Sequence, residues 1–422
     1  MLALVSLGTF GLFWYIGPEA KAAGATPPTE IGSPADDRLE LRSTILNPVL
    51  AGETLPPQQA ETDEIVSIFR SADEAMQRAL ENRPSAARLR NEVLNATIDE
   101  LEAYIERNSL SAWVPSLRVE LGVKYRGRGQ ITRALSHWEG AWNATRHIED
   151  GVGKLIADQS LIYRARLLAS LGRKEELGPL VQEHQYRPLA DARLAQIWAR
   201  TIEAYVVMHK APGLAYRCGT FALHNASKAH QGRHFTALWD TPSSTNGFSV
   251  GELSALSERE GLGLAAAIRN PGASLIVPAV VHWKQNHYAA ITESSDGLFR
   301  VQDPTMTMDA WMDFSAIDEE ASGFFLVPNT VTLPAGWRYA AQSEAARVYG
   351  KGVNEILDDG SEAEECEEDP ECCEPGGGPE GTGSGELCGM AEWSVQEPNI
   401  NLMVSDIPMA YERRWDLTSL LN

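Results

Sequence analysis

The apolar residues of this 422-residue chain follow two different periods, and the change between them constrains the fold more than any other feature. Between residues 64 and 210, apolar side chains recur at intervals of three and four, which is typical of α-helices. After Gly213, helical patterns give way to short apolar runs separated by turn residues, which is typical of strands. Helices that precede antiparallel strands predict a multi-domain α+β fold class, with a helical domain at 61–210 and a second domain at 211–350.

The second domain is expected to begin with two helices and to continue as an antiparallel sheet. The helical stretches are 218–230 and 249–260, and Ser249 with Glu252 three residues later has the pattern of a capping box. A polar turn at 293–297 between two apolar runs indicates a β-hairpin. The expected strands are 275–281, 287–292, 298–302 and 324–327.

One stretch of the helical domain has a specific order of small and bulky residues. It contains Leu121, Gly122, Tyr125, Gly129, Ala134, Trp138 and Ala141, and a weaker echo follows at Ala165, Leu168, Gly172 and Leu177. This order resembles degenerate tetratricopeptide (TPR-like) hairpins. Gly122 and Ala134 would let two antiparallel helices pack closely, while Tyr125 and Trp138 fill the groove to the next hairpin. A scaffold that binds a protein partner and simple helical packing are both open interpretations.

The charge balance excludes one large class of partner. Lys and Arg number 36 against 58 Asp and Glu, so the formal net charge is −22, which repels the phosphates of nucleic acids. Ten of the acidic residues fall within 358–374, in a segment that is also rich in Gly and Pro. Such a composition leaves almost nothing to bury, so we expect an acidic linker at 351–388.

The N-terminal segment indicates export. Residues 2–17 are apolar and uncharged, and Ala20-Lys21-Ala22 has the small residues that a signal peptidase accepts. We therefore expect a signal peptide or short membrane anchor at 1–22, and a secreted, periplasmic or membrane-associated protein. A buried first helix is the alternative. Residues 23–60, with repeated Pro, Gly and Thr, predict a flexible linker.

The five cysteines fall into two groups. Cys218 is alone in the predicted domains, and the acidic linker holds Cys366, Cys372, Cys373 and Cys388. The linker cysteines lack the paired CxxC spacing of structural zinc sites, so neither a metal nor another cofactor is expected. After export they would form disulfides, with three possible connectivities.

Cys218 begins a predicted helix, where a thiolate is favoured if an imidazole lies nearby. We expect the following Gly219 to leave room for a substrate. As an isolated residue, Cys218 would be interpreted as a buried small hydrophobe. His287 and Asp303 change that interpretation, because an imidazole and the acid that orients it would complete a catalytic set.

The hairpin places these two residues only if its register is suitable. The midpoint between His287 and Asp303 is Ser295, so the side chains face each other if the loop has an odd number of residues. A two-residue turn at 296–297 would instead set Asp303 opposite Ala290, with His287 on the other face. His282, inside an apolar run, is the competing histidine, and His224 is expected to be a packed or surface residue.

The chain resembles a family of papain-like cysteine peptidases, those that trim double-glycine leader peptides from bacteriocins. The resemblance covers residues 213–328 and depends on Cys218-Gly219, His287-Tyr288 and Asp303-Pro304 in that order. It implies a papain-like α+β domain in which Cys218 is the nucleophile, His287 the general base and Asp303 the residue that orients it.

One position departs from that family. The family has a Gln six residues before the Cys, which donates to the oxyanion, whereas this chain has Pro212. Loss of one such donor costs on the order of 10²- to 10³-fold in rate. Gln285 or Asn286 is a candidate substitute.

The C-terminal residues 389–422 resemble the start of large secreted RHS (YD-repeat) proteins. This resemblance implies an incomplete β region and a downstream RHS β-shell as a possible partner. The resulting hypothesis is an exported RHS-type protein with a cysteine peptidase domain that hydrolyses a peptide or protein substrate. The alternatives are an inactive pseudopeptidase that binds peptide, with the helical repeats as an interaction scaffold, and a purely structural module.

Overall fold

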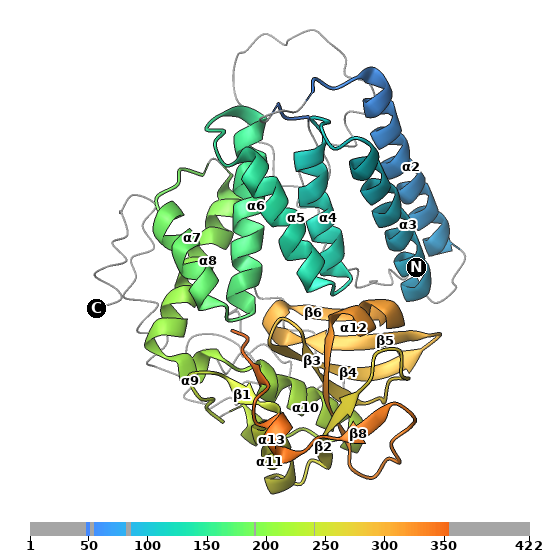
Figure 1. The fold of residues 1–422 in the computed structure, drawn as a ribbon, viewed down its shortest axis with the longest axis vertical. Helices are drawn as coiled ribbons and strands as arrows, with labels where there is room; N and C mark the ends of the chain where they lie inside the picture. The colour runs from blue at the N-terminus through green and yellow to red at the C-terminus, as the bar shows by residue number, and fades with distance from the viewer. Residues whose placement is uncertain (1–47, 51–54, 82–85, 190, 240, 354–422) are drawn as a thin grey trace, which may run out of the picture.

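In the computed structural model, the described residues are 48–50, 55–81, 86–189, 191–239 and 241–353 (Figure 1). The predicted signal or anchor segment, the linker cysteines and the RHS-like C-terminus lie outside them. Among the described helices, none combines the length and apolar character that a membrane crossing requires.

The first part of the described chain is helical, as predicted. All of its helices except the last, short one lie side by side in the upper half of Figure 1. They are α2 (Gln59–Glu81), α3 (Ala86–Arg107), α4 (Val114–Gly127), α5 (Ile131–Thr145), α6 (Gly151–Ser170), α7 (Lys174–His184), α8 (Ala192–Lys210) and the short α9 (Pro212–Ala215).

Gly122 allows α4 and α5 to pack closely, but its neighbour is Trp138 and not the expected Ala134. A Cβ atom at Gly122 would lie 2.2 Å from the indole Nε1 of Trp138. That nitrogen donates a hydrogen bond to the Val119 carbonyl (3.1 Å). The Trp138 ring also lies 5.8 Å from the ring of Tyr163 on α6, so it contacts the next helix as predicted.

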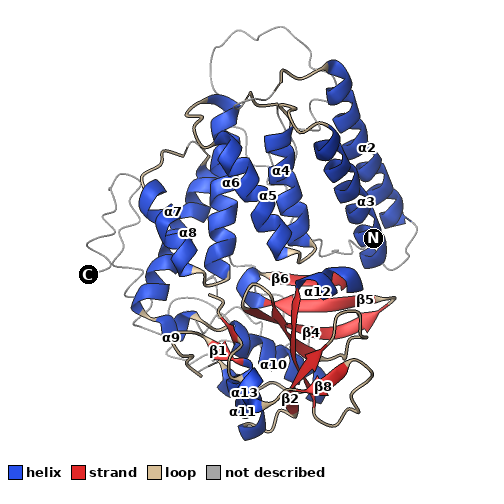
Figure 2. Cartoon of the chain, in the orientation of Figure 1, coloured by secondary structure: helices blue, strands red, loops and turns tan. Residues whose placement is uncertain are grey.

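The second part is an α+β region with a seven-stranded antiparallel sheet, which confirms the predicted fold class (Figure 2). The strand order is β6-β5-β4-β3-β7-β2-β8. The strands are β2 (Leu264–Arg269), β3 (Ala279–Trp283), β4 (His287–Ser295), β5 (Leu298–Asp303), β6 (Met308–Asp313), β7 (Ala321–Pro328) and β8 (Trp337–Tyr339). A separate two-stranded sheet pairs β1 (Phe248–Ser249) with β9 (Tyr349–Gly350).

The helices and short turns of this region frame the sheet. Helix α10 packs against β3, β4 and β5, and helix α11 packs against β2. Their bounds, with those of the remaining short elements, are α10 (Cys218–Gln231), η1 (Thr236–Leu238), α11 (Val250–Arg259), η2 (Pro304–Met306), α12 (Phe314–Glu320) and α13 (Gln342–Ala345). The capping box of α11 is present, with Ser249 and Glu252 bonding each other's main-chain N–H groups.

The strand predictions were correct for the hairpin and for 324–327, which lies within β7, and were incomplete elsewhere. β2, β6, β8 and the β1–β9 pair were not predicted. The first expected strand, 275–281, begins only at Ala279, because the chain before it forms turns and Pro278 has no N–H to donate to a ladder.

The helical part is joined to the α+β region by buried and half-buried polar contacts. In Figure 1 the ends of α3, α4 and α5 face β6 and α12. Arg128 forms an ion pair with Asp313 (2.9 Å), and Thr132 donates its main-chain N–H to Glu320 (3.0 Å). One apolar cluster continues through both parts, from the helices to Met312 on β6. The helical part therefore lies against the sheet on the side of β6 and α12.

Candidate functional site

Cys218 is the first residue of α10, as predicted, and it is only 2% exposed. Its N-terminal position aims the free N–H groups of the helix toward the thiol, which favours a negative charge there. Gly219 does not leave room for a ligand. A Cβ atom at Gly219 would lie 3.1 Å from the Leu253 side chain, so this glycine serves the packing of α10 against α11.

His287 and Asp303 meet in the interior beside Cys218. The His287 Nε2 and Asp303 Oδ2 atoms lie 2.6 Å apart, and both side chains are buried. Cys218 lies against the His287 ring, since one Cβ atom placed at Gly352 would come within 2.6 Å of Cys218 Cβ and 2.4 Å of His287 Cε1. Nε2 faces Asp303, and Nδ1 is on the side of Cys218, because a Cβ atom at Gly352 would lie 2.6 Å from both Nδ1 and Cys218 Cβ; Nδ1 also lies 3.0 Å from the Lys351 carbonyl oxygen. The structure thus brings together all three side chains that the sequence singled out.

A β-bulge sets the register that makes this meeting possible. The hairpin has the two-residue turn at 296–297, with Ser295 paired to Leu298, so the odd loop considered from the sequence was wrong. Between Ile291 and Glu293 the register shifts by one residue, and Ala290 pairs with Gln302. The next position along the ladder sets Asp303 opposite Ala289, on the same face as His287.

The charges of the site favour a protonated His287. Burial opposes a charge on the ring, but the Asp303 carboxylate and the negative charge that Cys218 can carry outweigh it and raise the pKa of His287 well above its usual value. A protonated His287 is the form that can give a proton to a leaving group.

Thr305 is a site residue that the sequence analysis missed. Its hydroxyl donates to Asp303 Oδ1 (2.6 Å), and its oxygen lies 3.1 Å from His287 Nε2. The main-chain N–H of Thr305 donates to the same carboxylate oxygen (3.1 Å). The sequence signal was Asp303-Pro304 followed by Thr305, which is the pattern of an Asp that caps a short helical turn.

His282, the competing histidine, lies on β3 and has a different role. Its Nε2 donates to the Tyr349 carbonyl oxygen (2.9 Å), so in the neutral ring Nδ1 accepts from the Ser322 hydroxyl (2.8 Å). Burial lowers the pKa of His282 to about 4, so the ring is neutral near pH 7. His224 is buried, with its ring 5.0 Å from that of Trp239, and is a packed residue as expected.

Of the two predicted substitutes for the missing oxyanion donor, Gln285 is bound to other partners. The amide nitrogen of Gln285 donates to Thr132 Oγ1 (2.7 Å), and its oxygen accepts from Arg173 (2.5 Å). The side chain of Asn286 is exposed. Gln285 therefore links the sheet to the helical part, because its two hydrogen bonds go to α5 and to the residue before α7.

Residues 349–353, which we call the cleft segment, cross the Cys–His pair. A Cβ atom at Gly352 would lie 2.4 Å from His287 Cε1 and 2.6 Å from Cys218 Cβ. The Lys351 carbonyl oxygen lies 3.0 Å from His287 Nδ1. The segment therefore covers the thiol and explains its low exposure.

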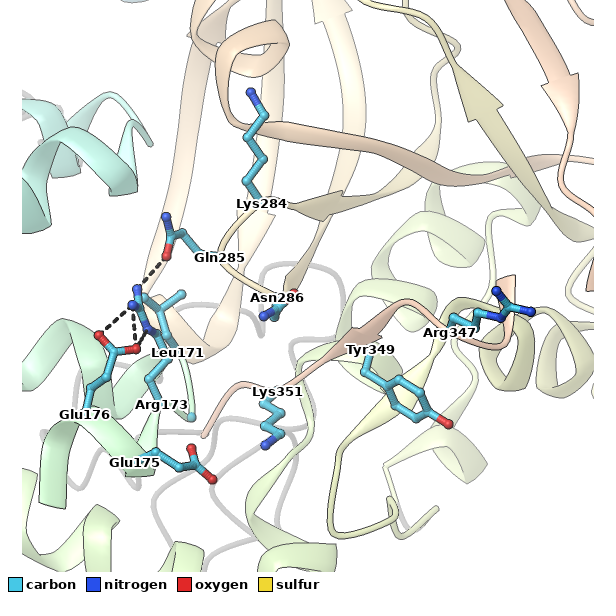
Figure 3. Close-up of a pocket in the computed structure, with 11 residues that line it drawn as sticks. Leu171, Arg173, Glu175, Glu176, Lys284, Gln285, Asn286, Arg347, Tyr349 and Lys351 are labelled. Carbon is cyan, nitrogen blue, oxygen red and sulfur yellow. Dashed lines mark hydrogen bonds and ion pairs between the residues drawn. The ribbon is translucent and has the colours of Figure 1, made fainter. Parts of the chain in front are cut away.

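A pocket of about 490 Å³ lies beside the cleft segment (Figure 3). Its walls are the turn after α6, the loop between β3 and β4, and the segment itself. Figure 3 shows Arg173 between Glu176 and Gln285, with Lys351 on the opposite wall. Charged groups of both signs line the pocket: Arg173, Glu175, Glu176, Lys284, Arg347 and Lys351. Both halves of the protein contribute to it.

Comparison with known proteins identifies no family. No family model, no curated protein and no solved structure matches the chain. Within the described ranges, no group of three or more His, Cys, Asp or Glu side chains is arranged to hold a metal ion. The function must therefore be argued from the site itself.

Proposed function

We propose that this chain is a cysteine peptidase in which Cys218 attacks a peptide carbonyl. The supporting observation is the buried contact of Cys218, at the N-terminus of α10, with His287, whose other ring nitrogen lies 2.6 Å from Asp303. His287 would exchange the proton with the thiol and with the leaving amine, and Asp303 would fix the ring. The resemblance to bacteriocin-leader peptidases supports the same assignment, within an exported RHS-type protein.

The test uses a chain in which the site is uncovered. In Gly352→Ala, the new methyl group meets two packed side chains, so the cleft segment must leave its position. We expect this variant to hydrolyse unfolded casein. A second substitution, Cys218→Ala or His287→Ala, should lower the rate by about 10³-fold or more. Hydrolysis that persists after Cys218→Ala would contradict the proposal.

A pH series of alkylation tests the activation of the thiol separately. In the Gly352→Ala chain we expect iodoacetamide to label Cys218 at pH 6, because the raised pKa of His287 keeps the imidazolium present there. With His287→Ala added, labelling should move to the alkaline range of an ordinary thiol, whose pKa is about 8.5. Identical pH profiles would mean that His287 does not activate the thiol.

The second candidate is a pseudopeptidase that binds peptide without cleaving it. The observation that favours it is the engagement of Gln285 by Thr132 and Arg173, which removes one of the two candidate replacements for the donor missing at Pro212. Such a protein would label at Cys218 and bind casein fragments without shortening them. The hydrolysis measurement on Gly352→Ala separates the two functions.

A further inference from the structure

The cleft segment lies in the site as an added strand. At one end, Gly350 pairs with Phe248 in the two-stranded sheet β1–β9. At the other end, Val353 forms an antiparallel bridge with Tyr216, two residues before the cysteine. An extended chain that adds itself to strand edges is a common way in which proteins bind peptides.

Main-chain hydrogen bonds hold the segment along its length. They connect Tyr349 O with His282 Nε2 (2.9 Å), Lys351 N with Asn286 O (2.7 Å), Gly352 O with Arg217 N (2.9 Å) and Val353 N with Ser170 O (3.1 Å). All four use main-chain atoms of the segment, so they do not depend on its side chains. This is the kind of contact by which a cleft binds an extended peptide. Asn286 and Arg217 immediately precede His287 and Cys218, so the hydrogen bonds align the segment with the reacting pair.

The segment has glycine at the two positions where a side chain has no room. A Cβ atom at Gly350 would lie 2.3 Å from the Tyr288 ring, and one at Gly352 would lie 2.4 Å from His287. Neither glycine has a left-handed backbone conformation. Glycine is thus needed at these two positions because the main chain lies very close to residues of the site, and not because the backbone has a conformation that only glycine adopts.

We propose that the cleft segment is the first substrate of this chain, cleaved in cis at the Lys351–Gly352 peptide bond. The inference rests on the proposed peptidase function and names its substrate. This bond is assigned because the Lys351 carbonyl oxygen lies 3.0 Å from His287 Nδ1, the nitrogen on the thiol side of the ring. The next residue, Gly352, is the one that contacts Cys218.

The chemistry needs only water as a co-reactant. The Cys218 thiolate attacks the Lys351 carbonyl carbon, and the C–N bond to Gly352 breaks as His287 Nδ1 gives its proton to the leaving amine. The resulting thioester joins Lys351 to Cys218. Water, losing a proton to His287, then hydrolyses the thioester and leaves a carboxylate at Lys351 and a free thiol at Cys218. The products are two chains, the second of which begins at Gly352.

The experiment follows the purified full-length chain over time by intact mass and by N-terminal sequencing. We expect a fragment that begins Gly352-Val353, and no such fragment from the Cys218→Ala chain. The half-time should not change over a 100-fold dilution, and Cys218→Ala chain added to the wild type should stay intact, because the cut is intramolecular. A cut at another bond, a cut that survives Cys218→Ala, or an intact wild-type chain would overturn the proposal.

A matched pair of glycine substitutions tests whether cleavage depends on the position of the cleft segment against Cys218 and His287. Gly352→Ala should abolish the cut by displacing the segment. Gly127→Ala should leave the half-time unchanged, since Gly127 is exposed at the end of α4 and its new Cβ atom would meet nothing within 4 Å. If Gly352→Ala were cleaved as fast as the wild type, cleavage would not depend on the observed position of the cleft segment, and the proposal would be overturned.

Failure of this inference is distinguishable from failure of the proposed function. If Gly352→Ala hydrolyses casein through Cys218 while the wild-type chain stays intact, the peptidase stands and the cis substrate is refuted. The segment would then be a permanent cover. If neither casein nor the segment is cut, both proposals fall.

Discussion

Asp303 is buried next to His287 and is surrounded by hydrogen-bond donors. Besides the imidazole, it accepts hydrogen bonds from the hydroxyl and the main-chain N–H of Thr305. Asp303 in turn raises the pKa of His287, which it contacts. Thr305 therefore acts on the thiol through two intermediate residues.

The hydroxyl of Thr305 can be tested by its removal. We expect Thr305→Val to lower the free energy of unfolding by about 1.5–3 kcal/mol, because a hydrogen bond to a buried charge is lost while the shape is kept. The measurement is urea unfolding. In an Asp303→Asn background the same substitution should cost less, because the acceptor is no longer charged. Equal costs in both backgrounds would show that the hydroxyl does not act through the carboxylate.

The capping box of helix α11 stabilises the strand edge on which the cleft segment lies. Its N-cap residue, Ser249, accepts a hydrogen bond from the Glu252 N–H (3.1 Å), and the Glu252 carboxylate accepts one from the Ser249 N–H (2.7 Å). The same Ser249 belongs to β1 and pairs with Tyr349 in the cleft segment. The capping box thus fixes the strand edge on which the segment lies.

We expect Ser249→Ala to destabilise the protein by about 1 kcal/mol through loss of the capping hydrogen bond. Thermal or urea unfolding measures the change. Ser295→Ala is the control, since Ser295 is exposed beside the hairpin turn and its substitution should stay within about 0.5 kcal/mol of the wild type. Similar losses in both variants would contradict the role of the capping box.

The two halves of the described protein are coupled through charged residues that are largely excluded from water. The side chains of Arg128 and Asp313 are 10% and 20% exposed. Burial opposes the charge on Asp313, but hydrogen bonds from Ser315 and Ala316 and the charge of Arg128 outweigh it and lower its pKa. Because Ser170 and Gln285 also lie on the contact between the halves, this coupling positions the cleft.

Arg128→Ala should lower the free energy of unfolding by about 1.5–3 kcal/mol at pH 7, since it leaves a half-buried carboxylate without its cation. Arg88→Ala is the matched control. It removes an exposed ion pair with Glu92, whose side chains are 60% and 58% exposed, and should cost less than about 0.5 kcal/mol.

The cost of Arg128→Ala should also depend on pH. Asp313 has a lowered pKa in the folded state, so its stabilising contribution is present above the unfolded value of about 3.9 and is lost as the pH falls through the folded value. We therefore expect the two arginine variants to converge in stability toward acid pH. A constant difference down to pH 2 would contradict this assignment.

Features that depend on neighbours along the chain could be predicted from the sequence. The period of three and four predicted the helices, Ser249 and Glu252 marked the start of α11, and Cys218 was correctly placed at a helix start. A helix closes its hydrogen bonds within four residues, so its signal is local.

Features that depend on partners distant in the sequence could be seen only in the three-dimensional fold. β2, with the sequence Leu-Ala-Ala-Ala-Ile-Arg, is a strand because β7 and β8 supply its hydrogen bonds. The bulge at Thr292 put Asp303 on the face of His287, and Gln285 was directed to Thr132 on a helix 153 residues away. The sequence of the cleft segment, Tyr-Gly-Lys-Gly-Val, likewise has no feature that predicts its contact with Cys218, which the fold brings about. Strand pairing and side-chain partners are set by burial and by donors remote in sequence, which no local pattern records.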